Sequence, residues 1–161
     1  MEGTHGVSGE IPLGRYTSDL DLLKEMILLL SYHAAGRAES GGMAWNRAVL
    51  SVEYANGERI DWSIPVDPSG GGHTVFMKTA PMLYMIPRHP VRLIGISVRE
   101  SEAPGFVQST FGEPADRRDR TAGSSLEELA SRLGTDPETL KKELLDIRYV
   151  RDTADRLRRR R

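Results

Sequence analysis

Few residues of this 161-residue chain stand at spacings that could support catalysis. The four histidines share no metal-ligand spacing, and Asp19 and Asp21 suit a helix N-terminus better than a pair of catalytic carboxylates. The Gly-rich stretch at residues 69–74 precedes a helical pattern but lacks the Lys of a phosphate-binding Walker loop. The chain has no cysteine, which excludes disulfides and thiol catalysis. The sequence therefore predicts no enzyme activity, no metal site and no cofactor.

The chemistry that the sequence does offer is cationic, and it is unevenly distributed. The whole chain has 22 Lys and Arg against 23 Asp and Glu. Residues 145–161 hold seven Arg and three Asp, whereas residues 1–144 carry an acidic excess of five. A basic tail that includes Arg158, Arg159 and Arg160 could contact phosphates, or it could be a solvated end of the chain. The near-neutral total therefore does not exclude nucleic acid as a partner.

The elements that would position these charges follow from hydrophobic periodicity. Residues 1–8 are expected to be disordered, and residues 10–16 to form a short strand. Ser18 is expected to cap a helix, because apolar residues recur at helical spacing from Leu20 to about residues 36–38. Residues 45–54 and 59–66 alternate in polarity, and the Asn56-Gly57 pair between them predicts a two-residue hairpin turn.

The remaining elements complete an α+β fold. Residues 74–86 have a helical pattern that Pro81 should kink or shorten, and residues 91–99 read as a buried strand. The order predicts a βαββαβ domain over residues 9–100, with a four-stranded, mainly antiparallel sheet and two helices on one face. Trp62 lies in the apolar register of its strand, whereas Trp45, at a strand start, could be exposed and stack on nucleic acid.

A second unit is expected beyond a flexible linker at residues 101–123. Residues 124–161 should form a helical appendage: a helical hairpin with an Arg-rich tail. The first helix is expected to be capped by Ser124 or Ser125 and ended by Gly134, and the second to be capped by Asp136. The hairpin looks like a helix-turn-helix, but the pattern favours an amphipathic pair that packs on another element.

Three stretches resemble one known family. Residues 90–98 (PVRLIGISV) look like the last strand of the little-finger domain of Y-family translesion DNA polymerases. Residues 33–44 are similar to that domain's helix end and glycine turn, and residues 49–57 to its second strand and hairpin. The expected element order is also the family's order, and the resemblance covers about residues 9–100.

The resemblance implies a function without catalysis. In the family this domain grips duplex DNA through the backbone, with one sheet face across the major groove, which gives register without reading sequence. The catalytic palm is absent from this chain. Ile94, Ile96 and Val98 would then face the helices, and Gly95 would let a sugar-phosphate strand approach closely. The residues that the resemblance and the charge pattern assign to DNA on the sheet are Arg47, Ser51, Arg59, Ser63, Arg92, Gly95, Ser97 and Arg99.

Partners other than DNA also follow from the sequence. Family members often carry a sliding-clamp peptide beyond the little finger, and Gln108 and Phe111 resemble its anchors, so a clamp or a polymerase subunit is a candidate partner. The expected role is an accessory one in DNA repair or damage tolerance. The alternative is a protein–protein adaptor that uses the helical hairpin and the linker peptide. A cytoplasmic location without a membrane span is expected, because no apolar run is long enough to cross a bilayer and the start lacks signal-peptide features.

Overall fold

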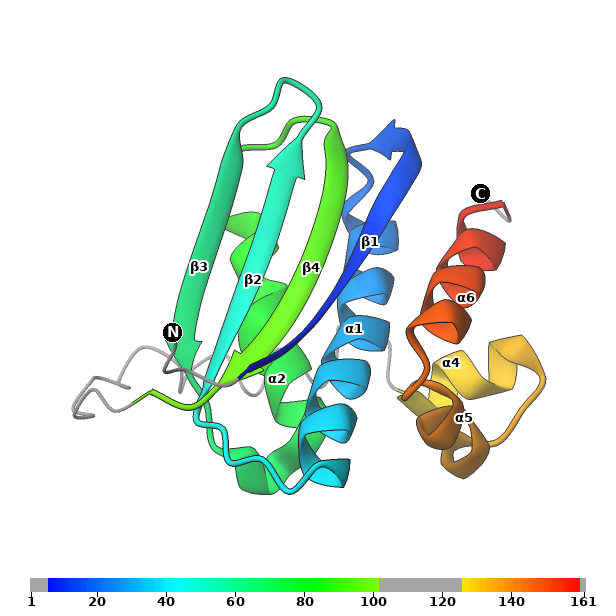
Figure 1. Ribbon diagram of the computed structural model, residues 1–161. Coiled ribbons are helices and arrows are strands. Elements are labelled where there is room, and N and C mark those ends of the chain that lie inside the picture. The colour runs from blue at the N-terminus through cyan, green and yellow to red at the C-terminus, as the bar shows by residue number, and fades with distance from the viewer. Residues whose placement is uncertain (1–5, 102–125, 160–161) are drawn as a thin grey trace.

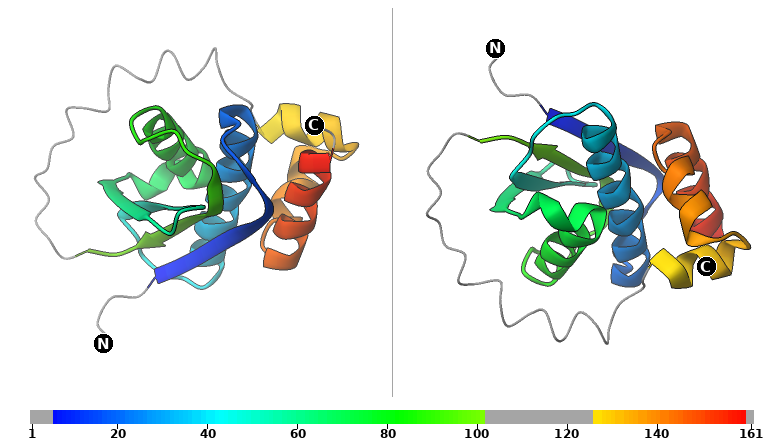
Figure 2. Two further views of the ribbon diagram at one scale, coloured as in Figure 1. Left: turned by 90° about the horizontal axis from the view of Figure 1, so that it is seen from above. Right: turned by 90° about the horizontal axis from the view of Figure 1, so that it is seen from below.

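The computed structural model of the protein describes residues 6–101 and 126–159. Residues 6–101 follow the order βαββαβ, and every pair of neighbouring strands is antiparallel (Figure 1). The sheet has the order β1-β4-β2-β3, and its strands are β1 (Gly6–Thr17), β2 (Arg47–Tyr54), β3 (Arg59–Pro65) and β4 (Val91–Arg99). Helices α1 (Leu20–Ser40) and α2 (Gly71–Thr79) cover one face of this sheet (Figure 2). The predicted α+β architecture of this part is confirmed.

Strand β1 begins earlier than its sequence suggests. Gly6 pairs with Arg99 and Ser8 with Ser97, so the expectation of disorder is wrong for residues 6–8. An edge strand can form its backbone hydrogen bonds without apolar side chains, so hydrophobic periodicity gives no signal for residues 6–8. Pro12 lies within β1 at the sheet edge, where its missing N–H costs no ladder hydrogen bond.

Both ends of α1 differ from the prediction. The N-cap is Asp19 rather than Ser18, because the Asp19 carboxylate accepts hydrogen bonds from the backbone N–H groups of Asp21 (3.0 Å) and Leu22 (3.3 Å). The helix continues to Ser40, past the expected end at residues 36–38. Gly36 serves packing rather than termination, since a Cβ there would lie 2.6 Å from Cδ2 of Leu145.

Two connections also differ in detail. The β2–β3 loop has three residues, because the N–H of Tyr54 still donates to the Glu58 carbonyl (2.8 Å) and Gly57 takes the left-handed conformation at φ +94°. The hairpin itself is thus as predicted, but the two-residue turn is wrong. Helix α2 starts at Gly71 and ends at Thr79, and Pro81 lies in the 3₁₀ helix that follows it, Ala80–Tyr84.

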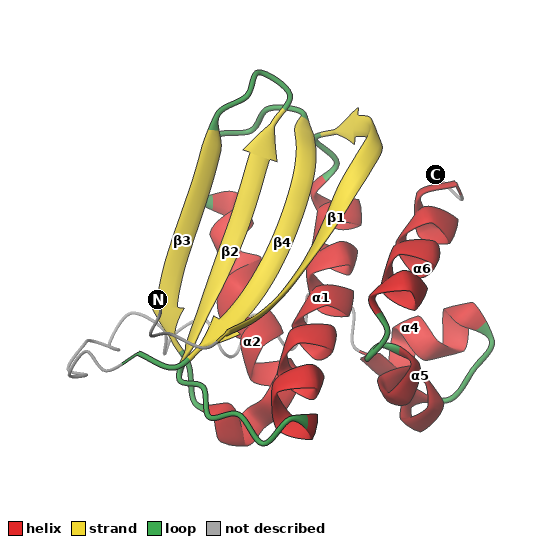
Figure 3. Ribbon diagram, viewed as in Figure 1, coloured by secondary structure: helices red, strands yellow, loops and turns green. Residues whose placement is uncertain are grey.

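The C-terminal part has three helices instead of a hairpin and a tail (Figure 3). These are α4 (Leu126–Leu133), α5 (Pro137–Glu143) and α6 (Ile147–Arg159). The predicted caps between α4 and α5 are confirmed: Gly134 has φ +78°, and the Asp136 carboxylate accepts from the N–H of Thr139. The Arg-rich tail is wrong as a description of residues 147–159. That stretch is an amphipathic helix whose buried side is formed by Val150, Thr153, Ala154 and Leu157.

Helix α1 lies between the sheet and these three helices. Leu29 and Leu30 are fully buried, and the α1 side turned away from the sheet packs on the C-terminal helices. Two polar contacts join the layers: Arg132 of α4 donates to the buried Glu25 carboxylate, and Nδ1 of His33 lies 2.7 Å from the Leu144 carbonyl oxygen. Burial lowers the pKa of His33, which favours the neutral ring with Nδ1–H as the donor. The C-terminal helices are therefore part of the same packed body as the sheet.

Candidate functional site

The sheet face opposite α1 and α2 is not covered by any described helix (Figures 1 and 2). Strand register arranges its outward residues in four rows across β1, β4, β2 and β3. The rows are Gly6–Arg99–Arg47–Pro65, Ser8–Ser97–Val49–Ser63, Glu10–Gly95–Ser51–Asp61 and Pro12–Leu93–Glu53–Arg59. All the sheet residues assigned to DNA from the sequence therefore share this face, with Arg92 added by an irregularity in β4. We call it the open face.

The first row places two arginines side by side. Arg47 on β2 pairs directly with Arg99 on β4, and Arg47 Nε donates to Ser63 Oγ at 2.8 Å. Arg99 is exposed and forms no ion pair with any residue that the structure describes. Like charges directly opposite each other destabilise an antiparallel pair. This end of the open face therefore carries two adjacent cations with no carboxylate in ion-pair contact among the described residues, although Arg99 is near enough to Asp61 to lower the pKa of that carboxyl.

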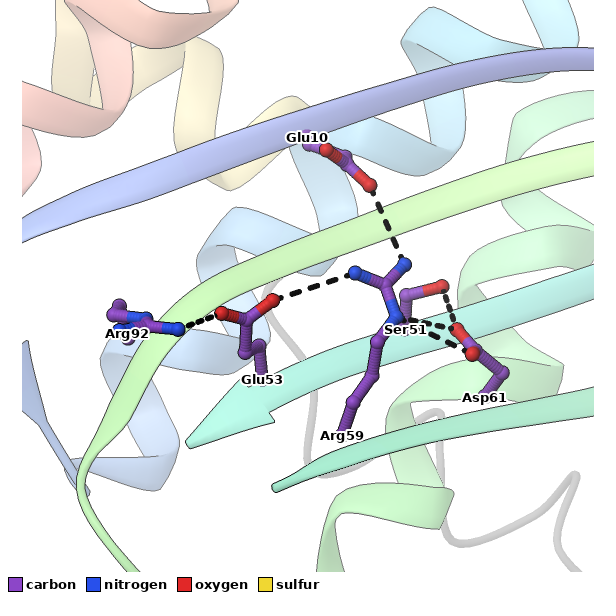
Figure 4. A network of polar contacts seen from close by, with 6 residues as sticks. All are labelled: Glu10, Ser51, Glu53, Arg59, Asp61 and Arg92. Carbon is purple, nitrogen blue, oxygen red and sulfur yellow. Dashed lines mark hydrogen bonds and ion pairs between the residues drawn. The ribbon is translucent and has the colours of Figure 1, made fainter. Parts of the chain in front are cut away.

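At the other end of the open face the arginines are paired with carboxylates (Figure 4). The Arg59 guanidinium lies 3.3 Å from Asp61 on its own strand, and 3.5 Å from both Glu53 on β2 and Glu10 on β1. We call these residues, with Ser51 and Arg92, the carboxylate network. Three acidic groups on three different strands thus surround one arginine.

The network favours the ionised form of Glu53 and Asp61. A hydrogen bond from Arg92 lowers the pKa of Glu53, and hydrogen bonds from the Ser51 hydroxyl (2.6 Å) and then from Arg59 lower the pKa of Asp61. The pKa of the Arg59 guanidinium is raised chiefly by its hydrogen bond to Asp61. A phosphate that approaches Arg59 must therefore compete with carboxylates already in place.

Gly95 has a different neighbour from the one predicted. A Cβ on Gly95 would lie 2.8 Å from Cγ of Glu10 and 3.1 Å from the Gly9 carbonyl oxygen. The absent side chain leaves room for Glu10 to cross β4 towards Arg59. In the structure the space above Gly95 is thus used by the carboxylate network, although the residue does lie on the open face as predicted.

Arg92 reaches the open face through a bulge. Strict alternation would turn it towards the helices with Ile94 and Ile96, but the pairing shifts from Glu53–Leu93 to Tyr54–Val91. Two β4 steps therefore match one β2 step, and the Arg92 guanidinium donates to the Glu53 carboxylate.

The basic residues near the C-terminus are partly engaged in the helix. Arg158 pairs with Asp155 at 2.9 Å and is half-buried, whereas Arg159 is exposed at the end of α6. Arg160 and the proposed clamp anchors Gln108 and Phe111 lie outside the described residues. Trp45 is 3% exposed, so its predicted exposure for stacking is wrong, and Trp62 is partly buried against the core.

The prediction missed the acidic members of the open face. Glu53 alternates in step with Arg47 and Ser51 on β2, and Asp61 with Arg59 and Ser63 on β3, so the sequence contained the signal for these two. No residue of β1 is assigned to DNA from the sequence, so Glu10 had no such signal. Among the described residues no group of three or more His, Asp or Glu could hold a metal ion, and no described helix is long and apolar enough to cross a membrane.

Comparisons with known proteins bear on the fold. No family model matches the chain, and no curated protein matches it. The chain is similar to a structure described as a complex of the beta-clamp processivity factor and the little finger domain of PolIV. The identity is 13% and the TM-score 0.49, over 67% of this chain and 99% of the matched one. A second similar structure, an insertion ternary complex of Dbh DNA polymerase, shares 14% identity with a TM-score of 0.45, over 60% of this chain and 28% of the polymerase chain.

Proposed function

We propose that this chain is a non-catalytic DNA-binding unit that holds duplex DNA by its sugar-phosphate backbone. The observation that carries the proposal is the direct pairing of Arg47 with Arg99 on an uncovered sheet face. Two opposed cations destabilise the sheet unless an anion lies between or above them, and a backbone phosphate supplies that anion. Ser63 and Ser97, which are exposed or half-buried in the adjoining row, add hydroxyl donors of the kind that contact phosphate oxygens.

The open face suits binding that does not read sequence. It is a hollowed sheet surface with short polar side chains such as Ser51, Ser63 and Ser97 between its arginines, and it presents no described helix that could enter a groove. Phosphate contacts fix the orientation of a duplex without distinguishing bases. An accessory role in DNA damage tolerance, which the sequence resemblance implies, would use this kind of binding.

The adaptor alternative is less well supported. Leu129, Leu140 and Leu144, which would form the apolar side of a helical hairpin, are fully buried within the chain. A hairpin whose apolar side already packs on α1 has little left to offer a protein partner. A sliding clamp or a polymerase subunit stays a candidate partner through Gln108 and Phe111.

The test is a titration of a labelled 20-base-pair duplex by fluorescence anisotropy at 50 mM and 200 mM salt. Phosphate binding should weaken with a log–log slope of about −0.9 per neutralised phosphate. Arg47→Ala combined with Arg99→Ala should weaken binding about tenfold or more and reduce the magnitude of the slope by about 2.

A matched control removes two positive charges from the opposite side of the sheet. Lys24→Ala with Lys78→Ala makes the same change of charge on α1 and α2, and it should leave the affinity within about twofold of the wild type. No binding at 50 mM salt, or equal losses in the two double variants, would overturn the proposal.

A further inference from the structure

Helix α6 forms a groove with the edge of the sheet. It runs beside β1, and Cδ1 of Ile147 packs near Gly9 (Figures 1 and 2). The groove lies between Gly6–Glu10 of β1 and residues 142–151 of the α5–α6 segment, with α1 also contributing to its lining. We call it the β1–α6 groove. It begins at the β1 end where Gly6 pairs with Arg99, so it adjoins the Arg47–Arg99 end of the open face.

The groove carries an excess of positive charge. Four cations line it: Arg37, Lys142, Arg148 and Arg151. The acidic residues that line it are Glu10, Glu143 and Asp146. The Glu10 carboxylate is already paired with Arg59, at 3.5 Å across the open face, so the groove keeps four cations against two acids.

The pairing within the groove is weak. Nε of Arg148 lies 3.8 Å from Asp146, and the two side chains are 86% and 55% exposed. An exposed ion pair at that distance contributes little, so Arg148 is available to another anion. Arg151 Nε donates to the backbone carbonyl of Glu10 at 3.4 Å, which holds its guanidinium at the sheet edge without neutralising it.

The spacing of the two basic areas fits a duplex. Arg47 and Arg99 lie on one side of β1, and Arg148 and Arg151 lie on the other. The distance between the two arginine pairs is about one strand spacing plus the radius of a helix with its side chains, which is on the order of 10–15 Å. The major groove of B-DNA is about 12 Å wide, so its two bordering backbones have a comparable separation.

We propose that the β1–α6 groove is a second phosphate-binding strip, which contacts one backbone of a duplex while Arg47 and Arg99 contact the other. The proposal rests on DNA binding by the open face and adds Arg148 and Arg151 to it. It also moves the C-terminal contribution from the last arginines of the chain to the first turns of α6.

The experiment uses the full chain and the same labelled duplex. Arg148→Ala combined with Arg151→Ala should raise Kd roughly 10- to 50-fold at 100 mM salt and reduce the magnitude of the salt slope by about 2. Arg148→Lys combined with Arg151→Lys keeps both charges and should stay within about threefold of the wild type. Thermal unfolding of each variant checks that α6 remains docked.

A matched pair of substitutions lies on the same helices but outside the groove. Lys141→Ala with Arg156→Ala removes two exposed cations from α5 and α6, and neither residue lines the groove. This control should change Kd less than threefold. Equal losses in the groove variant and the control would show a nonspecific effect of net charge and overturn the second strip.

The outcomes separate this proposal from the one on which it rests. If the wild type binds and the Arg47/Arg99 variant fails while the groove variant binds normally, the open face acts alone and the second strip is wrong. If the groove variant fails while the Arg47/Arg99 variant binds normally, the groove binds DNA without the open face, and both the two-sided contact and the assignment of the open face as the DNA site are wrong. If the wild type does not bind at 50 mM salt, both proposals are overturned.

Discussion

The arginines of the carboxylate network and those of α6 differ in what surrounds their charge. Arg59 faces Glu10, Glu53 and Asp61, which three strands bring together through their fixed register. Arg151 faces a backbone carbonyl, and Arg148 has one distant, exposed carboxylate. The number of arginines in a segment therefore says little about its affinity for phosphate; the neighbouring strands or turns decide how much of the charge is free.

The sheet and the C-terminal helices belong to one packed body, and substitution of Leu144 should have the largest effect on its stability. Leu144 is fully buried between α5 and α1, and its carbonyl accepts from His33. Leu144→Ala should lower the free energy of unfolding by about 2–5 kcal/mol, because it leaves a cavity at the junction. Both tryptophans of the chain, Trp45 and Trp62, belong to the sheet and its flank, so their fluorescence reports the unfolding of the sheet.

Urea denaturation followed by tryptophan fluorescence and by far-UV circular dichroism gives the measurement. The two probes should shift together to lower urea concentration in Leu144→Ala. Glu143→Ala, an exposed neighbour on the same helix, should stay within about 0.5 kcal/mol of the wild type. An unchanged fluorescence midpoint in Leu144→Ala would mean that the C-terminal helices unfold separately from the sheet.

A second substitution should make an arginine of the carboxylate network as available to phosphate as the arginines of α6. Glu53→Gln takes away the carboxylate that pairs with Arg92 and lies 3.5 Å from Arg59. Arg92 then loses its carboxylate partner and Arg59 loses one of its three, so duplex binding at 100 mM salt should tighten roughly three- to tenfold, with a steeper salt slope. Stability should change little, because the ion pairs are partly exposed.

The control for that prediction removes the same charge nearby. Glu58→Gln changes an exposed residue beside the β2–β3 loop that takes no part in the carboxylate network, and it should tighten binding less than twofold. Equal gains from the two substitutions would show that net charge matters and that the network does not restrain Arg59 and Arg92.

Features of this site that depend on a single strand could be predicted from the sequence, whereas features that depend on contacts between strands could not. Alternation assigned the open-face side of β2, β3 and β4 correctly, because a strand's period of two is a local property. The carboxylate network could not be located, since it joins Glu10 to Arg59 through a strand order that the local pattern does not specify. Alternation places Arg92 on the helix side of β4, and it does so wrongly because the bulge that turns this residue to the open face appears only in the paired sheet.

The third helix at the C-terminus was predictable and was missed. Ile147, Val150, Ala154 and Leu157 recur at helical spacing and form one side of α6. The many arginines between these apolar residues make the segment look like a charged tail and obscure the helical spacing of its apolar residues. Burial of that side against α1 could not be deduced, because α1 has apolar residues nearly all round and its second covering layer lies more than 80 residues further along the chain.

Gly95 gives the smallest expected effect, and the sign of that effect is informative. Two roles are possible for its missing side chain: room for the Glu10 side chain, as the contacts show, or close approach of a DNA backbone, as the sequence suggested. Gly95→Ala places a Cβ against Cγ of Glu10, which is a flexible side chain that can turn away and release Arg59 from one of its carboxylates. If the first role dominates, duplex affinity should rise about twofold.

A loss of affinity, with the unfolding midpoint unchanged, would instead mean that a phosphate or sugar occupies the space above β4 in the complex. Gly36→Ala, which meets Leu145 rather than any open-face residue, separates effects on packing from effects on binding.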